Sequence, residues 1–572
     1  MSTSVTTMYE WNEVDWSKLE RSTFKLQKRI YQAARHNDVK AVHKLQKLLM
    51  KSTGAALLAV RRVTQDNRGK GTAGIDGQAS LNDRQKIALF QEIKRAPMVS
   101  RCKPVRRVWI PKPGTNEQRP LGIPVMEDRA RQALAKMALE PEWEAKFEPN
   151  SYGFRPGRSC QDAITAIWLC IKQAPKYVLD ADIAKCFDRI NHEALLNKLG
   201  TFPEMRRAVK AWLKAGIMDG GDLFPTSEGT PQGGVISPLL ANIALHGLAT
   251  AIESAFQKHK VVSTGRTKWT PRVIRYADDF VVIHRDLEVI KRVKEIAAEW
   301  LKGMGLEMKP SKTRITHTLE SIDGPAGFDF LGFNVRQYAR GKSRGLRDGT
   351  GRRLSFTTSI RPSAESQKRL LQKIRKIVHT GRTWPQEGLI GSINPILRGW
   401  GNYYSTVVSK DIFHKLDHLI FWKLWAWACR RHSNKTRGWI ARRYWLHGNR
   451  GWKFETKEGT ALFSLSRIPI VRHVKVKGDA SPYNGDAFYW STRMGKHPDL
   501  PKLTAKMIKR QRGHCPECGL YFKTGDRLVE ARIKPDSSEG SSVRYVIVHD
   551  YCMKHHGRVV CDDNAPFCRG AG

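Results

Sequence analysis

Two adjacent carboxylates, Asp278 and Asp279, end a short segment at residues 276–279, Tyr-Ala-Asp-Asp. Apolar runs flank the segment at 273–274 and 280–283, a pattern that predicts a strand, a tight turn and a second strand. Carboxylate oxygens at such a turn are the ligands that Mg²⁺ prefers in proteins. Because Asp-Asp is also a common pair in solvated turns, a partner elsewhere in the chain is needed before chemistry can be assigned.

A second acidic strand is predicted at residues 177–183, Tyr-Val-Leu-Asp-Ala-Asp-Ile, with Asp180 and Asp182 near its end. Carboxylates from two strands can hold two Mg²⁺ ions roughly 3.5–4 Å apart, one activating an attacking 3′-hydroxyl and the other stabilising a leaving pyrophosphate. Crowded carboxylates repel one another, so bound metal is expected to stabilise them. The two segments together indicate nucleotidyl transfer, although spacing alone does not exclude Asp180 or Asp188 as ligands.

The composition indicates a large, basic protein of several domains. The chain has 572 residues, 40% of them hydrophobic, which is too long for one core and too apolar for a disordered chain. It carries 99 Lys and Arg against 54 Asp and Glu, a net charge of +45, and a polyanionic partner is the simplest explanation. Ribosomal-type packing proteins and membrane-surface proteins are alternatives. The sequence has no apolar run of membrane-spanning length and no secretory signal, so no membrane partner is expected.

The ten cysteines fall into two groups of five. One group is scattered along the chain, as free thiols in a reducing compartment would be, and predicts a cytoplasmic protein. The other group is crowded into the tail, which favours a metal site over disulfides. The scattered cysteines are Cys102, Cys160, Cys170, Cys186 and Cys429.

The tail contains two candidate ligand pairs for a metal ion. Cys515 and Cys518 form a Cys-x-x-Cys turn, and His549 and Cys552 form a second pair. Two such pairs suit tetrahedral Zn²⁺, which can stabilise a domain too small for a large core. Alternative ligands are His555 in the fourth position, or Cys561 with Cys568 in place of the second pair.

Helices and strands are expected to alternate around these motifs. Periodicity predicts helices at 17–63, 128–139 and 239–252, a helical region at 363–445, and strands at 105–110, 306–313 and 328–333. Lys112 and Arg119 flank a turn after the strand at 105–110. The two cations could bind a triphosphate, or they could be solvated charges of a loop. Loops rich in glycine are expected at 67–74, 229–238 and 340–353.

The helical region combines an apolar stripe with a basic back. Leu370 and Ile374 lie on the stripe, and Gly381 is a plausible end to the first helix. The stripe is expected to face a core, and the basic side chains are expected to contact phosphates. The residues proposed for RNA contact are Lys368, Arg369, Lys373, Arg375 and Lys376, with Arg437, Arg442 and Arg443 farther along the chain.

Several ordered blocks resemble the reverse transcriptases encoded by bacterial group II introns. The segment 119–124, Arg-Pro-Leu-Gly-Ile-Pro, is similar to a fingers motif of that family, and 276–279 is similar to its acidic turn. Because any single block is weak, the order of all of them carries the resemblance. The other blocks are 151–159, 180–188, 230–238, 399–404 and 435–440.

The resemblance implies an α+β multidomain fold, a right-hand polymerase with an antiparallel palm sheet. An α-helical thumb, called domain X or the maturase domain, and a small zinc-binding C-terminal domain complete the expected chain. The implied ranges are 1–75 for an N-terminal extension, 76–176 for the fingers, 177–340 for the palm, 341–445 for the thumb, 446–508 for a DNA-binding connector and 509–572 for an HNH-like domain.

The resemblance also assigns roles to individual residues. Asp182, Asp278 and Asp279 are implied to be catalytic, with Mg²⁺ held by Asp182, Asp278 and the backbone carbonyl of Ile183. Phe187 is implied to exclude a 2′-hydroxyl from the incoming sugar by its bulk. The remaining residues implied to contact the dNTP are Lys112, Arg119 and Gln232, with Lys312 near the leaving pyrophosphate.

The tail resembles the HNH-type endonuclease domains often appended to this family. Members usually carry histidines directly after a glutamate, but here Glu530 is followed by Ala531 and Arg532. Members also place histidine after the last zinc cysteine, where this chain has Met553. Imidazole is needed there to activate water and to bind the catalytic metal. The tail is therefore expected to bind Zn²⁺ and DNA without cleaving DNA.

The expected activity is RNA-directed DNA polymerisation coupled to binding of an intron RNA. The expected partners are that RNA, in a ribonucleoprotein that assists splicing, together with target DNA and dNTPs. Copying at the target would then proceed by target-primed reverse transcription. Two alternatives remain: a maturase whose polymerase core is only a scaffold, and a related polymerase recruited to defence.

Overall fold

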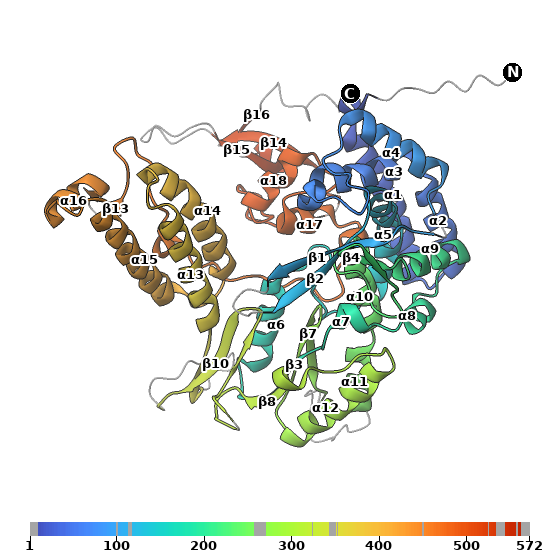
Figure 1. The fold of residues 1–572 in the computed structure, drawn as a ribbon, viewed down its shortest axis with the longest axis horizontal. Helices are drawn as coiled ribbons and strands as arrows, with labels where there is room; N and C mark the ends of the chain where they lie inside the picture. The colour runs from blue at the N-terminus through green and yellow to red at the C-terminus, as the bar shows by residue number, and fades with distance from the viewer. Residues whose placement is uncertain are drawn as a thin grey trace.

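The structure is a computed structural model that describes residues 10–98, 101–111, 117–256, 270–322, 324–341, 351, 353–448, 451–523, 525–533, 544–555 and 559–561. Figure 1 shows four parts: N-terminal helices, a central sheet with covering helices, a helical bundle, and a tail with its own small sheet. No helix within these ranges is long and apolar enough to cross a membrane.

Three consecutive helices cover most of the segment expected to be helical at 17–63: α1 (Trp16–Arg35), α2 (Val39–Lys51) and α3 (Thr53–Arg61). Asp38 caps α2 and Ser52 caps α3; each side chain satisfies a backbone N–H group, so a new helix begins there. These helices pack against α5 (Met126–Lys146), and α4 (Asp83–Arg95) also packs on this group. Short 3-10 or π segments lie at Trp11–Glu13, Arg62–Asp66, Arg68–Gly71, Pro310–Lys312, Leu465–Arg467 and Pro482–Asn484.

The central sheet has four antiparallel strands in the order β6-β7-β3-β8. Alternate side chains of a strand point to opposite faces. On β3, Val178 belongs to the core that includes α6, whereas Leu179 belongs to the core that includes α12. Helices thus cover both faces, which explains the continuous apolar runs of the strands (Figure 1). The elements are β3 (Tyr177–Asp182), β6 (Arg272–Tyr276), β7 (Asp279–His284), β8 (Arg314–His317), α6 (Cys160–Ile171) and α12 (Leu287–Lys302).

A second four-stranded sheet, ordered β2-β1-β4-β5, lies beside the central sheet (Figure 1). Strands β1 and β2 form an antiparallel hairpin, while β1 and β4 pair in parallel. Its strands are β1 (Val105–Pro111), β2 (Gln118–Ile123), β4 (Ile217–Asp219) and β5 (Asp222–Phe224). The same stretch of chain also contains α7 (Cys186–Arg189), α8 (His192–Leu199), α9 (Pro203–Leu213) and α10 (Ser237–Leu245), and α11 (Leu248–Ala255), which packs against β6 and α12.

Two expectations about local structure are wrong, and a third is right only in part. The helix expected at 239–252 is divided into α10 and α11, because Gly247 has a φ of +97°, a conformation outside the right-handed helix. The strand expected at 306–313 is a loop with one 3-10 turn beginning at Pro310, since proline lacks the N–H that a strand ladder uses. The expected strand at 328–333 is the corner between β9 (Phe328–Phe330) and β10 (Phe333–Ala339), which pairs with β11 (Phe356–Pro362).

The helical region expected at 363–445 is confirmed as a bundle of four helices. Leu370 and Ile374 are buried, and Gly381 caps the end of the first helix. Most aromatic side chains of the bundle are buried or half-buried, but Trp422 is 52% exposed. The helices are α13 (Ala364–Thr380), α14 (Gln386–Tyr404), α15 (Lys410–Arg431) and α16 (Arg437–Tyr444).

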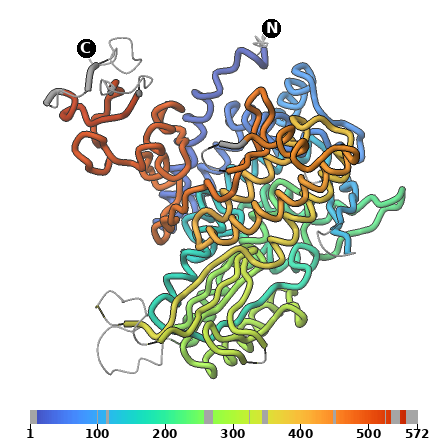
Figure 2. Tube along the Cα trace, turned by 90° about the vertical axis from the view of Figure 1, so that its left-hand side faces the viewer, coloured from blue at the N-terminus to red at the C-terminus, as the bar shows by residue number. Residues whose placement is uncertain are grey.

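The tail folds back onto the N-terminal half of the chain, as the red and blue ends of Figure 2 show. Trp490 is fully buried, and a Cβ atom at Gly157 would lie 2.3 Å from its ring. Asp162 on α6 accepts hydrogen bonds from Arg493 and the backbone N–H of Val476. The tail elements are β12 (Trp445–Gly448), β13 (Gly451–Phe454), α17 (Ala487–Met494), α18 (Lys502–Arg510), β14 (Leu528–Ile533), β15 (Arg544–His549), α19 (Asp550–His555) and β16 (Val559–Cys561).

Candidate active site

The register of the central sheet brings the two acidic segments together. Asp182, the last residue of β3, pairs directly with Asp279, the first residue of β7. Asp278 lies in the two-residue turn between β6 and β7, and its carbonyl accepts a hydrogen bond from the backbone N–H of Ile183 at 3.3 Å. The first turn residue, Ala277, has a φ of +58°, a left-handed conformation that is costly for a residue with a side chain.

Burial and mutual repulsion disfavour charge on this cluster. Burial, together with the neighbouring charges of Asp278 and Asp182, raises the pKa of Asp279 to about 7. Burial is also the main reason that the pKa of Asp278 is raised. One cation already faces the cluster, since Lys312 Nζ lies 2.6 Å from the Asp182 carboxylate. The cluster can therefore attract further positive charge, as a divalent cation would supply.

A cavity of about 990 Å³ opens next to the carboxylates. Its walls come from β1 and β2, from the end of β3 with α7, and from the loop before α10. The sequence-proposed residues that line it are Arg119, Asp182, Ile183, Phe187, Gln232, Asp278, Asp279 and Lys312. Lys112 lies outside the described residues.

Backbone contacts fix Gln232 at the edge of the cavity. Its carbonyl accepts a hydrogen bond from the N–H of Gly122 on β2 at 2.9 Å. Its side-chain amide donates to the Asp188 carboxylate at 3.4 Å. The same loop is held from below by His192, whose Nε2 lies 2.6 Å from the Gly229 carbonyl. The loop can thus present one amide at a defined position.

Phe187 stands on α7 directly after the strand that carries Asp182. It is half-buried, and its ring centroid lies 6.2 Å from that of Phe154 in an edge-to-face arrangement. Such a pair restricts both rings. The side chain is therefore a fixed wall of the cavity, placed a few residues from the carboxylates.

Sequence reasoning did not single out Arg275, Asn242 or Lys309. Lys309 lines the cavity, and its backbone N–H donates to the Asp182 carbonyl at 2.7 Å. Arg275 is 3% exposed and directly precedes the acidic turn. The sequence did contain a sign that Arg275 is buried. A charged residue that directly follows apolar residues in a predicted strand implies a buried partner.

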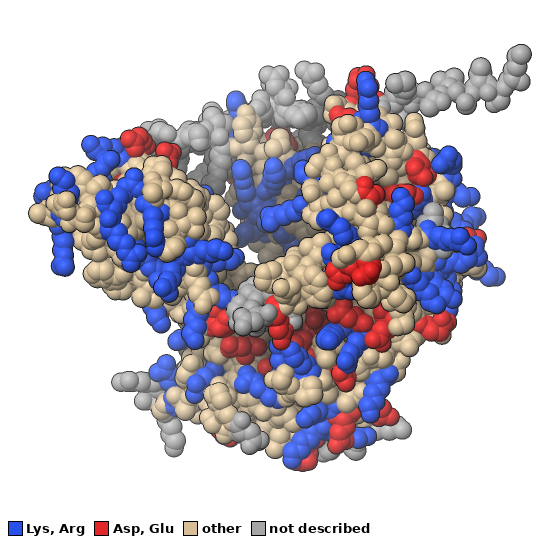
Figure 3. Space-filling model, in the orientation of Figure 1, with Lys and Arg blue, Asp and Glu red and all other residues tan. Residues whose placement is uncertain are grey.

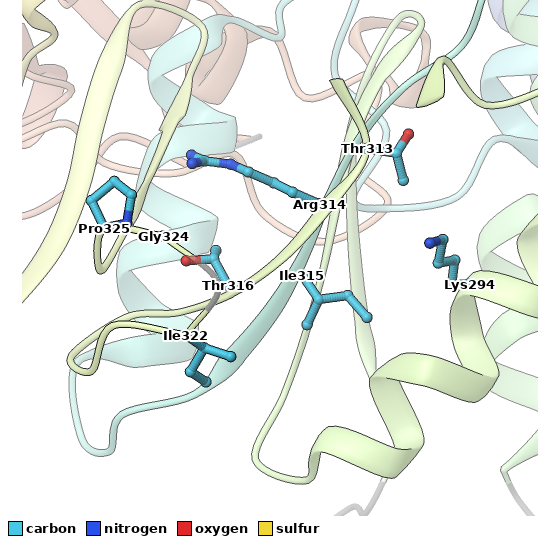
Figure 4. Close-up of a pocket in the computed structure, with 8 residues that line it drawn as sticks. All are labelled: Lys294, Thr313, Arg314, Ile315, Thr316, Ile322, Gly324 and Pro325. Atoms are coloured by element: carbon cyan, nitrogen blue, oxygen red, sulfur yellow. The ribbon is translucent and has the colours of Figure 1, made fainter. Parts of the chain in front are cut away.

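A smaller cavity of about 300 Å³ lies at the edge of the central sheet (Figure 4). Its lining residues come from β8 and the preceding Thr313, from α12, and from Ile322, Gly324 and Pro325. They include Lys294 and Arg314 but, among the described residues, no acid. This cavity therefore lacks the ligands for the chemistry of the larger one.

The tail contains a compact group of metal-binding side chains. One ligand atom from each of Cys515, Cys518, His549 and Cys552 lies within 4.8 Å of the others. His549 Nδ1 faces Cys518 Sγ at 3.4 Å, and its Nε2 lies 3.3 Å from the Asp526 carboxylate. A second contact of this kind orients a histidine whose other nitrogen binds metal. Three sulfur donors and one nitrogen suit Zn²⁺.

The tail also contains the alternative metal ligands and the two positions at which HNH-type domains carry histidine. The side chains of His555, Cys561 and Cys568 lie outside the described residues. Ala531 is fully buried in β14, and Met553 packs against the small core of the tail. Glu530 accepts a hydrogen bond from Thr504 at 3.1 Å. Neither Ala531 nor Met553 supplies a group that can transfer a proton.

Basic side chains gather around a hollow between the bundle and the N-terminal helices, and acidic side chains gather below it (Figure 3). All eight residues proposed for RNA contact have exposed side chains. Five lie on α13 and three on α16, at the outer end of the bundle (Figure 1). The apolar sides of these helices pack inward through residues such as Leu370 and Ile440, so the charges are available to a polyanion.

Comparison with known protein families gives three matches along the chain. Residues 110–335 match the reverse transcriptase (RNA-dependent DNA polymerase) family. Residues 11–93 match the N-terminal domain of reverse transcriptase, and residues 367–445 match the maturase-specific domain of group II introns. These matches include the carboxylate cluster and the bundle and end before the tail.

Individual relatives agree with these matches. Protein YkfC of Escherichia coli strain K12 is 34% identical over 324 residues, which cover 51% of this chain and 83% of that protein. The group II intron-encoded protein LtrA of Lactococcus lactis subsp. cremoris is 28% identical over 469 residues, covering 69% of this chain and 76% of that protein. Maturase-like protein 1 of Euglena gracilis is 25% identical over 393 residues, covering 68% and 76%.

Proposed function

Because the chain belongs to the reverse transcriptases encoded by group II introns, and is thus an RNA-directed DNA polymerase, we propose that it copies its own intron RNA into DNA. In this proposal it also binds that RNA and assists its splicing, and synthesis starts at a DNA target. The observation that carries the proposal is the register that places Asp182 opposite Asp279, beside a cavity large enough for a nucleotide.

We propose that Asp182, Asp278 and the carbonyl of Ile183 hold two Mg²⁺ ions, with Asp279 supporting the site. The metal ions, when bound, would activate the 3′-hydroxyl and neutralise the leaving pyrophosphate. Lys312, now paired with Asp182, has a flexible side chain that can turn toward an anionic leaving group. In-line transfer needs positioning and charge neutralisation more than an unusual nucleophile.

The other side chains of the cavity have proposed roles toward the dNTP. Arg119, with Lys112 beyond the described residues, would bind the triphosphate, since charged donors bind phosphate strongly. Gln232 would contact the nucleotide from the loop before α10. Phe187 would block a 2′-hydroxyl, because it is a fixed aromatic wall.

The bundle is proposed to be the thumb and the RNA-binding part of the protein. Its match to the maturase-specific domain and the exposed basic residues on α13 and α16 support this. Each phosphate contact releases counterions, so RNA binding should weaken strongly as salt rises. The six domain ranges expected from the sequence and a cytoplasmic location, in which the thiols stay reduced, belong to the same proposal.

The tail is proposed to be a zinc-stabilised, HNH-like module that binds target DNA without cutting it. The Cys515, Cys518, His549 and Cys552 group supports Zn²⁺. An antiparallel pair, β14 and β15, followed by α19 supports the HNH-like arrangement. The buried Ala531 at a catalytic position of that family supports loss of cleavage.

Primer extension tests the polymerase proposal. The purified protein is given an RNA template, an annealed DNA primer, dNTPs and Mg²⁺, with and without its own intron RNA. Wild-type protein should extend the primer, and Asp278→Ala should not. Normal extension by Asp278→Ala would remove Asp278 from the site, and splicing that needs a protein unable to extend any primer would favour a maturase with a scaffold core.

A nicking assay tests the proposed role of the tail. The ribonucleoprotein is incubated with labelled target DNA, and both strands are resolved. We expect DNA binding without cleavage of the strand that serves as primer. Cleavage of that strand that is lost in Cys515→Ala but persists without the RNA would overturn the proposal.

A further inference from the structure

A buried polar network lies directly behind the acidic turn. Its centre is Arg275, whose side chain is 3% exposed. Arg275 Nη1 donates to the Ala277 carbonyl at 3.1 Å and to Asn242 Oδ1 at 3.1 Å. A guanidinium is expensive to bury, so its presence two residues before Ala277 needs a reason beyond packing.

The contact to Ala277 satisfies an acceptor that the turn would otherwise leave buried. Ala277 is itself 7% exposed and has a φ of +58°, a strained conformation that persists only when its surroundings impose it. The hydrogen bond from Arg275 reaches the carbonyl of this same residue. Arg275 is therefore in a position to hold the peptide that precedes Asp278.

Asn242 connects Arg275 to a third segment. It lies on α10, is 2% exposed, and donates its side-chain amide to the Gly153 carbonyl at 2.8 Å. A Cβ atom at Gly153 would lie 2.3 Å from the Ala277 nitrogen, so only glycine allows this approach. The turn is thus enclosed by β6, by α10 and by the segment around Gly153.

The positive charge of Arg275 is paired with the carboxylate of Glu148, on the side away from the turn. Arg275 Nη2 lies 4.0 Å from Glu148 Oε2, and Glu148 Oε1 accepts backbone hydrogen bonds from Gly247 and Ala249. Burial raises the pKa of Glu148, but His246, Arg275 and backbone donors outweigh it and leave a pKa of about 2. The Glu148 carboxylate therefore stays charged and keeps the guanidinium in place.

We propose that Arg275 and Asn242 are positioning residues that hold the strained Ala277 peptide and thereby set the place of the Asp278 and Asp279 carboxylates. This inference rests on the proposed role of those carboxylates in polymerisation. Neither residue touches substrate; both act through the turn. We call the hydrogen bonds of Arg275 and Asn242 to the turn the brace. A displacement of about 1 Å at a catalytic group can cost roughly 100-fold in rate, and we expect a loss of that size when the brace is removed.

The test compares Arg275→Met and Asn242→Leu with wild type in primer extension at several Mg²⁺ concentrations. We expect kcat per active site to fall by roughly 100-fold in Arg275→Met and the Mg²⁺ needed for half activity to rise. The KM for template-primer should stay near that of wild type. Arg275→Lys, which keeps the charge opposite Glu148, should recover part of kcat. Asn242→Leu leaves the ion pair intact, so it tests the brace even if Arg275→Met folds poorly.

A matched control separates positioning from general damage. Arg131→Met removes another guanidinium with 2% side-chain exposure, but its partners Glu127 and Glu92 lie away from the turn. This variant should lower the melting temperature without changing the Mg²⁺ dependence. In a double variant of Arg275 and Asn242, the losses in rate should be less than additive, since both act through one contact chain.

The outcomes distinguish the two levels of inference. Extension by Asp278→Ala would overturn the proposed function itself. If Asp278→Ala is inactive while Arg275→Met and Asn242→Leu both keep wild-type kcat and Mg²⁺ dependence, the brace is refuted and the proposed function stands. A loss of melting temperature alone, equal to that of Arg131→Met, would also refute the brace.

Discussion

The central sheet and the tail each contain a candidate metal site, but the two sites are assembled in opposite ways. The carboxylates around Asp278 stand on strands buried on both faces, within cores formed by much of the chain. In the described part of the tail, the core has eight buried residues, which include the ligands Cys515 and Cys552. A large core can hold repelling charges in place and leave them ready for metal, whereas a small core needs metal to hold it together.

The electrostatics follow the same division. In the central sheet, burial and the charges of Asp278 and Asp182 raise the pKa of Asp279 to about 7, so these carboxylates repel one another until a cation neutralises them. In the tail, His549 is already oriented by Asp526, as in a site that retains one ion. The difference agrees with the proposed catalytic role of the first site and the proposed structural role of the second.

The largest expected effect is that of Asp278→Asn on polymerisation. The change removes a proposed metal ligand, so primer extension should fall at least roughly 1000-fold. Stability should rise, because one of the repelling charges is gone. The measurements are extension rate and melting temperature, with Asp329→Asn, an exposed acid on β9, as control. A variant that loses both activity and stability would contradict this account of the central site.

Cys515→Ser should produce the converse result. The protein should lose about one equivalent of zinc, and a protease should cleave the tail selectively, because the small core no longer folds. Primer extension should remain, since the carboxylates stand on other cores. Zinc content by mass spectrometry and limited proteolysis check this, with Cys429→Ser in the bundle as control. Full zinc content in Cys515→Ser would show that another ligand set binds the ion.

Phe187→Ala sharpens the comparison inside the central site. Removing the fixed ring should reduce discrimination against ribonucleotides by roughly 10–100-fold, while dNTP use falls less. Single-nucleotide incorporation with dNTP and rNTP measures the ratio. Trp168→Ala is the control, since Trp168 is a half-buried aromatic residue on α6 that is not among the described residues that line the cavity. Equal discrimination in Phe187→Ala and wild type would assign the selection to another residue.

The smallest expected effect concerns His192 and pH. Burial lowers the pKa of His192 below 6.5, so the unfolded chain binds the proton more readily. The stability contributed by neutral His192 is present above about pH 6.5 and decreases as the pH falls through the folded-state pKa. The loss of melting temperature between about pH 8 and about pH 5.5 should be smaller in His192→Gln than in wild type. Identical losses would show that His192 does not titrate in this window.

Much of the central region follows from local sequence. The apolar runs at 177–183 and 280–283 predicted strands that the structure contains. The pairing of Asp182 with Asp279 was not predictable, because register depends on how both faces of the sheet pack. Arg275 shows the same limit: its partner Asn242 lies 33 residues away on another element. The predictions of a strand at 306–313 and of one helix at 239–252 were wrong, because Pro310 and Gly247 each interrupt the apolar pattern around them.

The tail was predictable to a different degree. The Cys-x-x-Cys spacing identified the ligand group, because metal geometry limits the spacing of ligands. The contact between Asp526 and His549 was not expected, since it joins a loop to the end of β15. The packing of residues 470–493 against α6 was also not apparent, because nothing local marks which surface an extended segment will cover.

The packing of Trp490 against Gly157 decides where the chain can be shortened. If the protein ended at residue 445, the indole would leave an open notch, and Asp162 would lose Arg493 and the Val476 N–H. Asp162 would keep only its hydrogen bonds from Ser159, and a buried acid that loses partners destabilises its surroundings, here the helix that covers the central sheet. Ending the chain after Arg493 keeps these contacts, whereas a cut after residue 508 would divide α18, whose Ile508 belongs to the core of the zinc module. Residues 470–493 therefore stabilise the polymerase part of the chain, and a truncation that preserves it should end after them.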